Sequence, residues 1–386
     1  MTSRILITNS TLILSDRELP DHWMLIKQGK IASWGKGEAP SAETIIDGRG
    51  ETYVLPGFID IHVHGAMGFD MMDATPEALK AMSRFFAAHG VTGFLPTTVT
   101  APHERILDAL RNVAAHMGAE MPGAMVLGAH LEGPYINLNA KGAQAGEFVR
   151  LADPTEYEQW LDTEAIKLTT VAPEFGPNEA FISACAARGV TVSIGHTQAT
   201  YEQALRAVRL GARHATHTFN AMTGLHHRKP GVVGAALTLS EITCELIADM
   251  IHVHPVILKL VLAAKGAEGI ALITDAIQGA GMPDGAYELG GLAVTVSNGT
   301  ATLSDGTLAG SVLTMDAGVR HMMNQAGASL VQVAQMSSTV PARQIGWGQH
   351  KGRIQAGYDA DLVLLDPQQQ VRTTLVAGRV VYQTAL

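Results

Sequence analysis

The sequence predicts an α/β protein: a (β/α)8 TIM-like barrel with a small β-sandwich domain formed by the N- and C-terminal segments. Eight short apolar runs alternate with segments of helical spacing between residue 56 and about residue 345. Continuously apolar strands that alternate with helices are typical of parallel sheets, and eight such units suit a barrel of about 250 residues. Strand patterns without helices occupy the first 55 residues and return near the end. We expect a small β-domain at 1–55 plus 350–386, with the barrel, 56–349, inserted in it.

The small β-domain is predicted from short strand patterns separated by turn residues. In the N-terminal segment we expect strands at 5–7, 11–14, 23–27, 30–35 and 44–47. The C-terminal stretch ADLVLLDPQQQVRTTLVAGRVVYQ returns to strand patterns. We expect it to pair with the N-terminal strands.

The barrel elements are predicted from apolar runs and helical periodicity. The expected strands are 58–65, 92–99, 124–133, 166–174, 190–197, 214–221, 244–253 and 270–276. Expected helices, most of which end near glycine, are 76–90, 103–118, 177–189, 199–212 and 255–266. After the last strand we expect a hairpin insert near 286–304, because Asn298-Gly299 is a turn signal.

Composition limits the class of protein. The chain has 386 residues, of which 47% are hydrophobic and 16% charged, so a large core can form and little disorder is expected. The net charge of −9 argues against non-specific nucleic-acid binding. Two cysteines, the absence of a signal-peptide pattern and the absence of an apolar run of about 18 residues favour a cytoplasmic protein. We expect no nucleic-acid or membrane partner.

The stretch PGFIDIHVHG ends an apolar strand in two histidines, His62 and His64. Side chains two apart on a strand point to the same side, so both imidazoles can face a common metal ion. The alternative is a pair of satisfied or exposed histidines at a strand end. A metal site therefore requires further ligands elsewhere in the chain.

Further candidate ligands follow the other predicted strands. Active sites of such barrels lie at the C-terminal ends of the strands. Each side chain alone has a structural alternative, such as a paired carboxylate, a turn cap or a histidine bound to a carbonyl. Together they predict a site for a divalent metal, with zinc, iron or manganese as candidates. The residues are His62, His64, Glu132, His196, His217, His252 and Asp275.

An ordered set of motifs carries a family resemblance over essentially the whole chain. The motifs are PGFIDIHVHG, HLEGPYIN, GHTQAT, THTFNAMTGLHHRKPG, IADMIHVHP, ITDA and LAGSVLTM. The sequence resembles the amidohydrolase superfamily and, within it, the N-acetylglucosamine-6-phosphate deacetylase family. It is similar also to the N-acetylgalactosamine-6-phosphate version. The resemblance implies hydrolysis of an N-acetylhexosamine 6-phosphate to the amino sugar 6-phosphate and acetate, with the gluco epimer preferred.

The resemblance also implies roles for the candidate ligands. Glu132, His196 and His217 match the metal site common to the family. His62 and His64 match variable positions that hold a second ion when both are histidine. Glu132 would then bridge the two ions and Asp275 would contribute to the site. We expect one or two divalent ions, with zinc preferred, Asp275 as general base and acid, and His252 polarising the acetyl carbonyl.

Substrate contacts are likewise implied by the resemblance. Arg228 matches a phosphate-binding arginine on a loop that reaches the neighbouring subunit's site, so a homodimer is expected. Gln144 stands where the family commonly has a histidine, which leaves the sugar preference open. The implied substrate-binding residues are Ala143, Gln144, Asn220, Ala221, His227, Arg228, His252, Leu308, Ala309 and Gly310.

Two other functions remain open at this point. The chain could be another amidohydrolase, acting on an N-acyl amino acid or a cyclic amide with the same metal ligands. It could also be a non-catalytic relative that serves as a scaffold. The Arg228 loop disfavours the first alternative. The second is disfavoured because every expected ligand position holds a competent residue.

Overall fold

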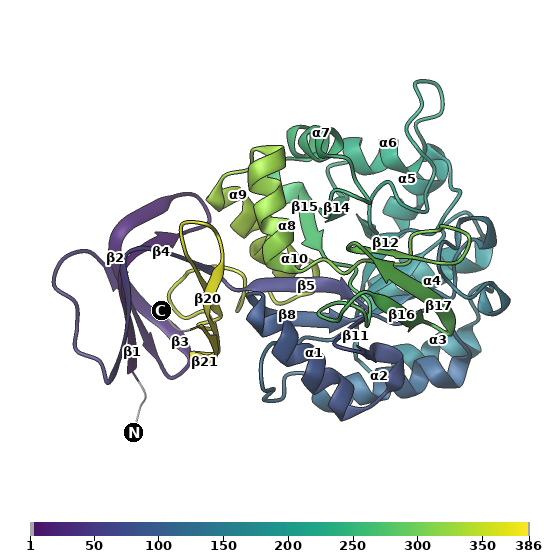
Figure 1. Ribbon diagram of the computed structural model, residues 1–386. Coiled ribbons are helices and arrows are strands. Elements are labelled where there is room, and N and C mark those ends of the chain that lie inside the picture. The colour runs from purple at the N-terminus through teal and green to yellow at the C-terminus, as the bar shows by residue number, and fades with distance from the viewer. Residues whose placement is uncertain (1–3, 385–386) are drawn as a thin grey trace.

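The computed structural model describes residues 4–384 and consists of a barrel with a smaller sheet at its side (Figure 1). The seven strands of the smaller sheet are hydrogen-bonded in the order β21-β20-β19-β4-β1-β2-β3. Both ends of the chain therefore contribute to it, and it has its own apolar core. Its strands are β1 (Arg4–Ile13), β2 (Glu18–Lys27), β3 (Lys30–Gly35), β4 (Thr44–Pro56), β19 (Leu362–Leu365), β20 (Val371–Val376) and β21 (Arg379–Gln383).

The first and fourth strands are longer than predicted. β1 joins two predicted strands across Asn9, which has a φ of +50°. β4 continues through Arg49 and Gly50, whose φ values are also positive, at 53° and 79°. The pairing of β1 with β4 shifts register between Thr8 and Ser10. The sequence GRG lies in this shift, where residues 48–51 of β4 stand opposite the single residue Asn9 of β1.

The barrel contains a strand in each of the eight predicted runs, so the predicted fold class is confirmed. The third run holds two short strands. Asp275 N donates to His62 O over 2.9 Å, which joins the last strand to the first and closes the barrel. The strands are β5 (Phe58–Val63), β8 (Val91–Pro96), β9 (Met125–Val126), β10 (Ala129–Glu132), β11 (Ile166–Val171), β12 (Thr191–Ile194), β13 (Ala212–Ala215), β14 (Thr243–Ile247) and β15 (Ile270–Ile273).

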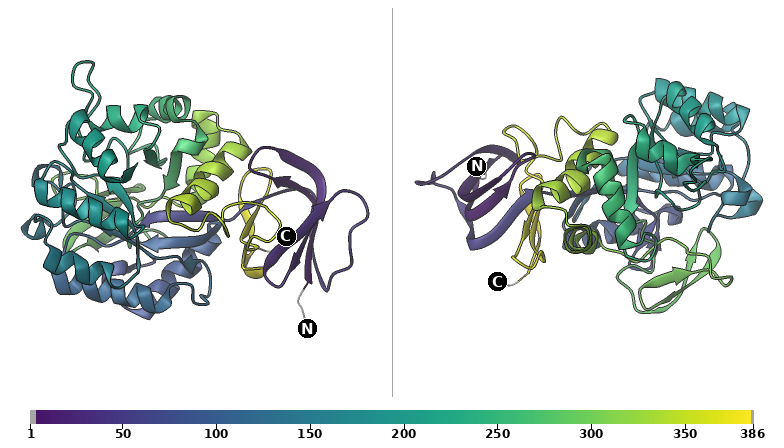
Figure 2. Two further views of the ribbon diagram at one scale, coloured as in Figure 1. Left: turned by 180° about the vertical axis from the view of Figure 1, so that it is seen from behind. Right: turned by 90° about the horizontal axis from the view of Figure 1, so that it is seen from above.

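The five predicted helices are present and lie outside the strands (Figure 2). They are α1 (Pro76–Ala88), α2 (His103–His116), α4 (Gly176–Ala187), α5 (Tyr201–Leu210) and α7 (Pro255–Lys265). The chain returns toward the small sheet through α8 (Met315–His321), α9 (Leu330–Ala334) and α10 (Val340–Gln344). Within residues 4–384, no helix has the length and apolar character that crossing a membrane requires.

Two helices that lie between barrel strands were not predicted. α3 (Pro154–Leu161) has only eight residues, although Asp153 caps its start and Pro154 occupies its first turn. That start signal could have revealed it. α6 (Gly231–Thr238), GVVGAALT, is apolar on nearly all sides, and its first six residues are buried. Such a helix lacks the polar face that makes helical periodicity visible.

Short elements connect these units. Residues 285–302 form a three-stranded antiparallel sheet, β16 (Gly285–Leu289), β17 (Leu292–Ser297) and β18 (Thr300–Thr302), beside the mouth of the barrel. Asn298-Gly299 makes the turn between β17 and β18. The remaining elements are β6 (Gly65–Ala66), β7 (Phe69–Asp70), η1 (Met71–Asp73), η2 (Leu138–Ala140), η3 (Gly146–Phe148), η4 (Ala267–Gly269), η5 (Met322–Ala326) and η6 (Gln335–Thr339).

A buried lysine ties the end of the barrel to the small sheet. Lys351, 2% exposed, lies 2.6 Å from Asp361 and 3.0 Å from Asp359. Lys351→Ala is expected to lower the free energy of unfolding by about 3–5 kcal/mol, because it leaves the buried carboxylate of Asp361 without a cation. Lys30→Ala is the matched control: Lys30 also pairs with Asp359 but is half exposed, so about 1 kcal/mol or less is expected. Denaturant unfolding checks both values, and equal losses would contradict the expectation.

Candidate active site

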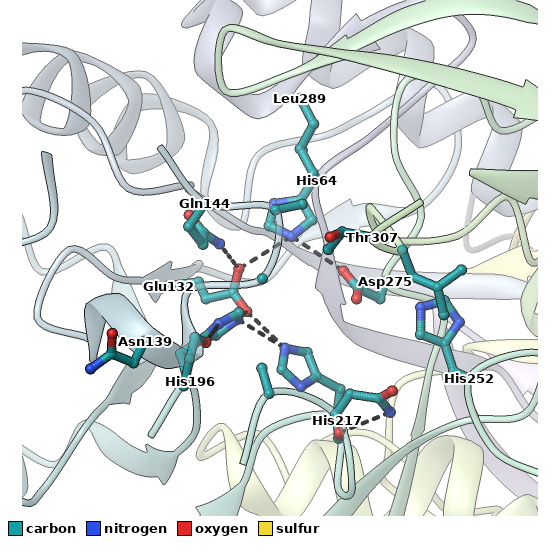
Figure 3. Close-up of a pocket in the computed structure, with 17 residues that line it drawn as sticks. His64, Glu132, Asn139, Gln144, His196, His217, His252, Asp275, Leu289 and Thr307 are labelled. Atoms are coloured by element: carbon teal, nitrogen blue, oxygen red, sulfur yellow. Dashed lines mark hydrogen bonds and ion pairs between the residues drawn. The ribbon is translucent and has the colours of Figure 1, made fainter. Parts of the chain in front are cut away.

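Side chains from the C-terminal ends of the barrel strands converge on one cavity of about 370 Å³. Its wall includes His64, Glu132, His196, His217 and Asp275, which point toward one another (Figure 3). These residues follow five different strands, so the barrel brings together positions that are far apart in the sequence. The structure therefore assembles the predicted ligand set at the expected end of the barrel.

Glu132 lies at the centre of this cluster. Its Oε1 is 3.1 Å from His196 Nε2 and 3.2 Å from His217 Nε2. The two imidazole nitrogens are 3.1 Å apart. Glu132, His196 and His217 thus direct three ligand atoms toward one small volume.

A second group shares the same carboxylate. Glu132 Oε2 is 3.4 Å from His64 Nε2, and Glu132 Oε1 is 3.4 Å from His62 Nε2. Asp275 Oδ1 is 3.2 Å from His64 Nε2 and 3.5 Å from His62 Nε2. Because Glu132 belongs to both groups, its carboxylate lies between two neighbouring candidate positions for a cation.

The donor set fits a divalent cation. His62 Nε2 and Asp275 Oδ1 are buried and have no hydrogen-bond partner in the structure. Only one proton can lie between the adjacent nitrogens of His196 and His217. Buried polar atoms without partners are rare, and several in one place indicate an ion that would satisfy them. Imidazole nitrogens and carboxylate oxygens are ligands that zinc, iron and manganese accept.

The ring nitrogens on the far side of the imidazoles are held by the backbone. His196 Nδ1 lies 2.9 Å from Ala140 O, and His64 Nδ1 lies 3.2 Å from Thr97 O. A carbonyl oxygen can only accept, so each Nδ1 carries the proton. Each Nε2 therefore faces the cavity and is the atom that would ligate a metal.

The two carboxyl groups are kept ionised by the histidines. Burial raises the pKa of Glu132, but the imidazoles of His62 and His196 hold that pKa well below its usual range. Burial likewise raises the pKa of Asp275, but the effect of His62 and His64 is larger, so the pKa of Asp275 is lowered overall. In the absence of a cation, Glu132 and Asp275 overcome burial and raise the pKa of His64 to about 10. The cluster thus attracts positive charge.

Backbone strain concentrates at this site. The φ angles are positive at His196 (45°), His217 (26°), Ala221 (51°) and Asp275 (52°), all of them non-glycine residues. Each such conformation costs about 1–3 kcal/mol and persists only when the surrounding structure enforces it. The conformation that directs these residues into the cavity therefore lowers the stability of the fold.

His252 lies in the loop after β14, although the sequence suggested a strand as far as residue 253. Its side chain lines the cavity, and its Nδ1 is 2.7 Å from Asp249 Oδ2. Asp249 Oδ1 also accepts from the backbone N–H of His252, over 2.8 Å. Burial lowers the pKa of His252, but its contacts with Asp249 outweigh burial and raise that pKa. Asp249 thus orients a proton donor toward the cavity.

Gln144 lies on the cavity wall but is hydrogen-bonded to Glu132, one of the candidate metal ligands. Its Nε2 donates to Glu132 Oε2 over 2.6 Å, and its Oε1 accepts from Thr100 N over 2.6 Å. The residue is 4% exposed. Both ends of the amide are therefore committed within the protein.

Most of the other predicted substrate residues line the cavity, namely Ala143, Asn220, Ala221, Leu308 and Gly310. Ala309 does not, because its side chain is fully buried behind the wall. A Cβ at Gly310 would lie 2.8 Å from Asp275 O. Glycine therefore allows this turn to approach Asp275 closely.

The predicted phosphate residues lie elsewhere. His227 and Arg228 are exposed on the loop between β13 and α6, which projects from the barrel (Figure 1). Arg228 Nη1 donates to His227 Nε2 over 2.7 Å. Among the described residues that form the cavity wall, none is lysine or arginine. One copy of the chain thus supplies no lysine or arginine to the described cavity wall that could hold a phosphate.

Several contributors were not named from the sequence. Leu289 and Thr307 line the cavity, and Leu289 comes from the inserted sheet. Asp249 and Glu245 lie behind His252 and His62. Glu245 interrupts the otherwise apolar strand β14, and a lone carboxylate in a buried strand signals a partner elsewhere.

The chain is similar to known enzymes over nearly its whole length. Residues 53–381 match the model of the amidohydrolase family. The N-acetylglucosamine-6-phosphate deacetylase of Bacillus subtilis (strain 168) is 38% identical, over 99% of this chain and 98% of that protein. The N-acetylgalactosamine-6-phosphate deacetylase of Escherichia coli O157:H7 is also 38% identical, over 95% of this chain and 97% of that protein.

A solved structure shares the fold. A mutant of the Mycobacterium smegmatis N-acetyl-D-glucosamine-6-phosphate deacetylase, in complex with N-acetyl-D-glucosamine-6-phosphate, superposes with a TM-score of 0.92 at 32% identity, over 98% of this chain and 99% of that one. The chain therefore belongs to the amidohydrolase family and, within it, to the N-acetylglucosamine-6-phosphate deacetylase family.

Proposed function

We propose that this protein hydrolyses the acetamide of an N-acetylhexosamine 6-phosphate, releasing acetate and the amino sugar 6-phosphate. N-acetylglucosamine 6-phosphate is the proposed preferred substrate. The observation that carries the proposal is the convergence of Glu132, His196 and His217 with Asp275 at one cavity. Relatives with this activity match the whole length of the chain.

Glu132, His196 and His217 would hold one divalent cation, and His62 and His64 would hold a second that shares Glu132. Zinc is the proposed ion, with iron or manganese as alternatives. When bound, such a cation acts as a Lewis acid, which polarises an amide carbonyl and makes water acidic enough to react near neutral pH.

Asp275 is the proposed proton carrier. Its carboxylate lines the cavity beside His64, and the lowered pKa keeps it ready to accept a proton from water. The same oxygen would then deliver that proton to the amide nitrogen as the C–N bond breaks. Asp249 raises the pKa of His252, and the doubly protonated ring would donate from Nδ1 to Asp249 and from Nε2 to the carbonyl oxygen. No covalent intermediate is required.

The phosphate is proposed to bind Arg228 of a second copy of the chain. The described cavity wall contains no lysine or arginine, and Arg228 lies on a projecting loop, exposed with His227. A guanidinium can hold two phosphate oxygens at once. A homodimer in which each loop completes the other site would supply the missing charge.

Metal binding is expected to compete with protons. Because the metal-free carboxylates raise the pKa of His64 to about 10, this imidazole is protonated at neutral pH and must lose its proton to bind a cation. Apparent zinc affinity of the metal-free protein should therefore rise with pH from 6 to 9, about tenfold per pH unit for each proton released. Calorimetric titration in buffers of different ionisation enthalpy measures the released protons. Affinity independent of pH would contradict this.

The function is tested by a panel of four substrates. Initial rates are compared for the 6-phosphates of N-acetylglucosamine and N-acetylgalactosamine, for unphosphorylated N-acetylglucosamine and for an N-acetyl amino acid. We expect the highest kcat/KM for the 6-phosphate of N-acetylglucosamine. The kcat/KM for the unphosphorylated sugar should be much lower. Faster hydrolysis of the N-acetyl amino acid would show that the phosphate is not recognised. A higher kcat/KM for the galacto epimer would correct the sugar preference.

A further inference from the structure

One carboxylate beneath the cavity touches two of the candidate metal ligands. Glu245, on β14, is fully buried. Its Oε2 is 3.0 Å from His62 Nδ1 and accepts the backbone N–H of His217 over 2.9 Å. Its Oε1 lies 3.3 Å from His214 Nε2. No part of the proposed reaction assigns it a role.

The contact with His62 determines which ring nitrogen carries the proton. An ionised carboxylate can only accept, so His62 Nδ1 must donate to Glu245. His62 Nε2 is then the atom that would ligate a metal, and it faces Glu132 Oε1 at 3.4 Å without a hydrogen bond of its own. His62 thus differs from His64 and His196, whose Nδ1 atoms are held by backbone carbonyls. A charged carboxylate makes the imidazole a stronger ligand than a carbonyl does.

The contact with His217 supports a strained backbone. His217 has a φ of +26°, and its N–H would be left without this acceptor if Glu245 were absent. His217 belongs to the group with Glu132 and His196, whereas His62 belongs to the group with His64 and Glu132 and to one with His130 and Glu245 itself. One oxygen therefore connects the two groups that contain Glu132.

We infer that Glu245 is a positioning residue that fixes the tautomer of His62 and so determines how tightly the His62–His64 position holds a divalent ion. The inference depends on the proposed metal site but not on the identity of the substrate. Loss of an outer carboxylate behind a metal-bound histidine typically weakens metal binding by about 10–100-fold.

The test measures zinc binding to the metal-free full-length protein by competition with a chelator, without any sugar substrate. Wild type should bind two ions. Glu245→Met, which removes the acceptor, should bind the weaker ion about 10–100-fold less tightly. Glu245→Gln keeps the shape of the side chain and one acceptor oxygen. It tests the inference even if the methionine variant does not fold. We expect it to bind the weaker zinc ion about tenfold less tightly. Asp316→Asn is the control, because Asp316 also pairs with a histidine Nδ1, that of the partly exposed His89 at 3.0 Å, away from the cavity.

A double-mutant cycle separates positioning from a general structural role. His62→Ala should itself abolish the weaker ion, and adding Glu245→Gln to it should not weaken the remaining ion by more than about twofold. Wild-type zinc affinity in Glu245→Gln would overturn the inference, as would a wild-type protein that binds a single ion. Failure of the deacetylation assay would leave these zinc measurements unchanged, so the two proposals fail separately.

Discussion

Asp275→Asn is expected to lower kcat by a factor of about 10² or more while the protein keeps its fold and most of its bound metal. Asparagine has nearly the same shape but cannot accept a proton from water or deliver one to the leaving nitrogen. Asp275 is suited to both steps, because it lines the cavity and its carboxyl is kept ionised by His62 and His64. The measurement is steady-state kcat together with metal content by elemental analysis.

The fold must be shown to be intact in this variant. Asp275 N donates to His62 O, which closes the barrel, and Asp275 O accepts from Ser311 N in the segment before α8. The substitution leaves those bonds in place, so the unfolding midpoint should change little. Near-wild-type kcat with full metal content would remove Asp275 from the proton-transfer role. Loss of both metal and turnover would instead assign it as an essential ligand.

Arg228→Ala is expected to raise KM for the phosphorylated sugar by about 10–10²-fold, since a charge-assisted pair of hydrogen bonds to phosphate is lost. The kcat should change much less, because the phosphate is remote from the amide bond. Lys229→Ala is the matched control on the same exposed loop. An unchanged KM in Arg228→Ala would show that the phosphate binds elsewhere.

Mixing two impaired variants, assayed at a substrate concentration far below the KM of Arg228→Ala, tests whether the loop acts on a second subunit. In a mixed dimer of Arg228→Ala and Asp275→Asn, one cavity has an intact Asp275 and receives Arg228 from its neighbour. Random exchange of subunits should then restore about a quarter of the wild-type number of active sites. If Arg228 acted within its own chain, no mixture would recover activity.

The parts of the fold that were predictable are those in which local pattern and burial agree. The barrel strands are continuously apolar, and helices such as α5 have an apolar and a polar face with a cap at Thr200. The bulges at Asn9 and Arg49 were not predictable, since they depend on the register of β1 against β4. Register is set by pairing between distant segments, which periodicity does not show.

In the candidate site, too, some features could be predicted from the sequence and others could not. His64, Glu132 and Asp275 could be named because each ends a recognisable strand. The pairing of His62 with Glu245 could not, because the partners lie 183 residues apart and only the closed barrel brings them together. The place of Arg228 could not be settled either. Its loop is exposed, and its proposed ligand belongs to another subunit.

The position of β4 in the small sheet has a consequence for synthesis of the protein. β4 lies between β1 and β19, and Leu364 pairs with Val54 although the whole barrel separates them in sequence. On the ribosome, β4 is complete long before β19 has been translated. A nascent chain therefore carries one open strand edge until its last segment emerges, and such an edge is a template for pairing between neighbouring chains.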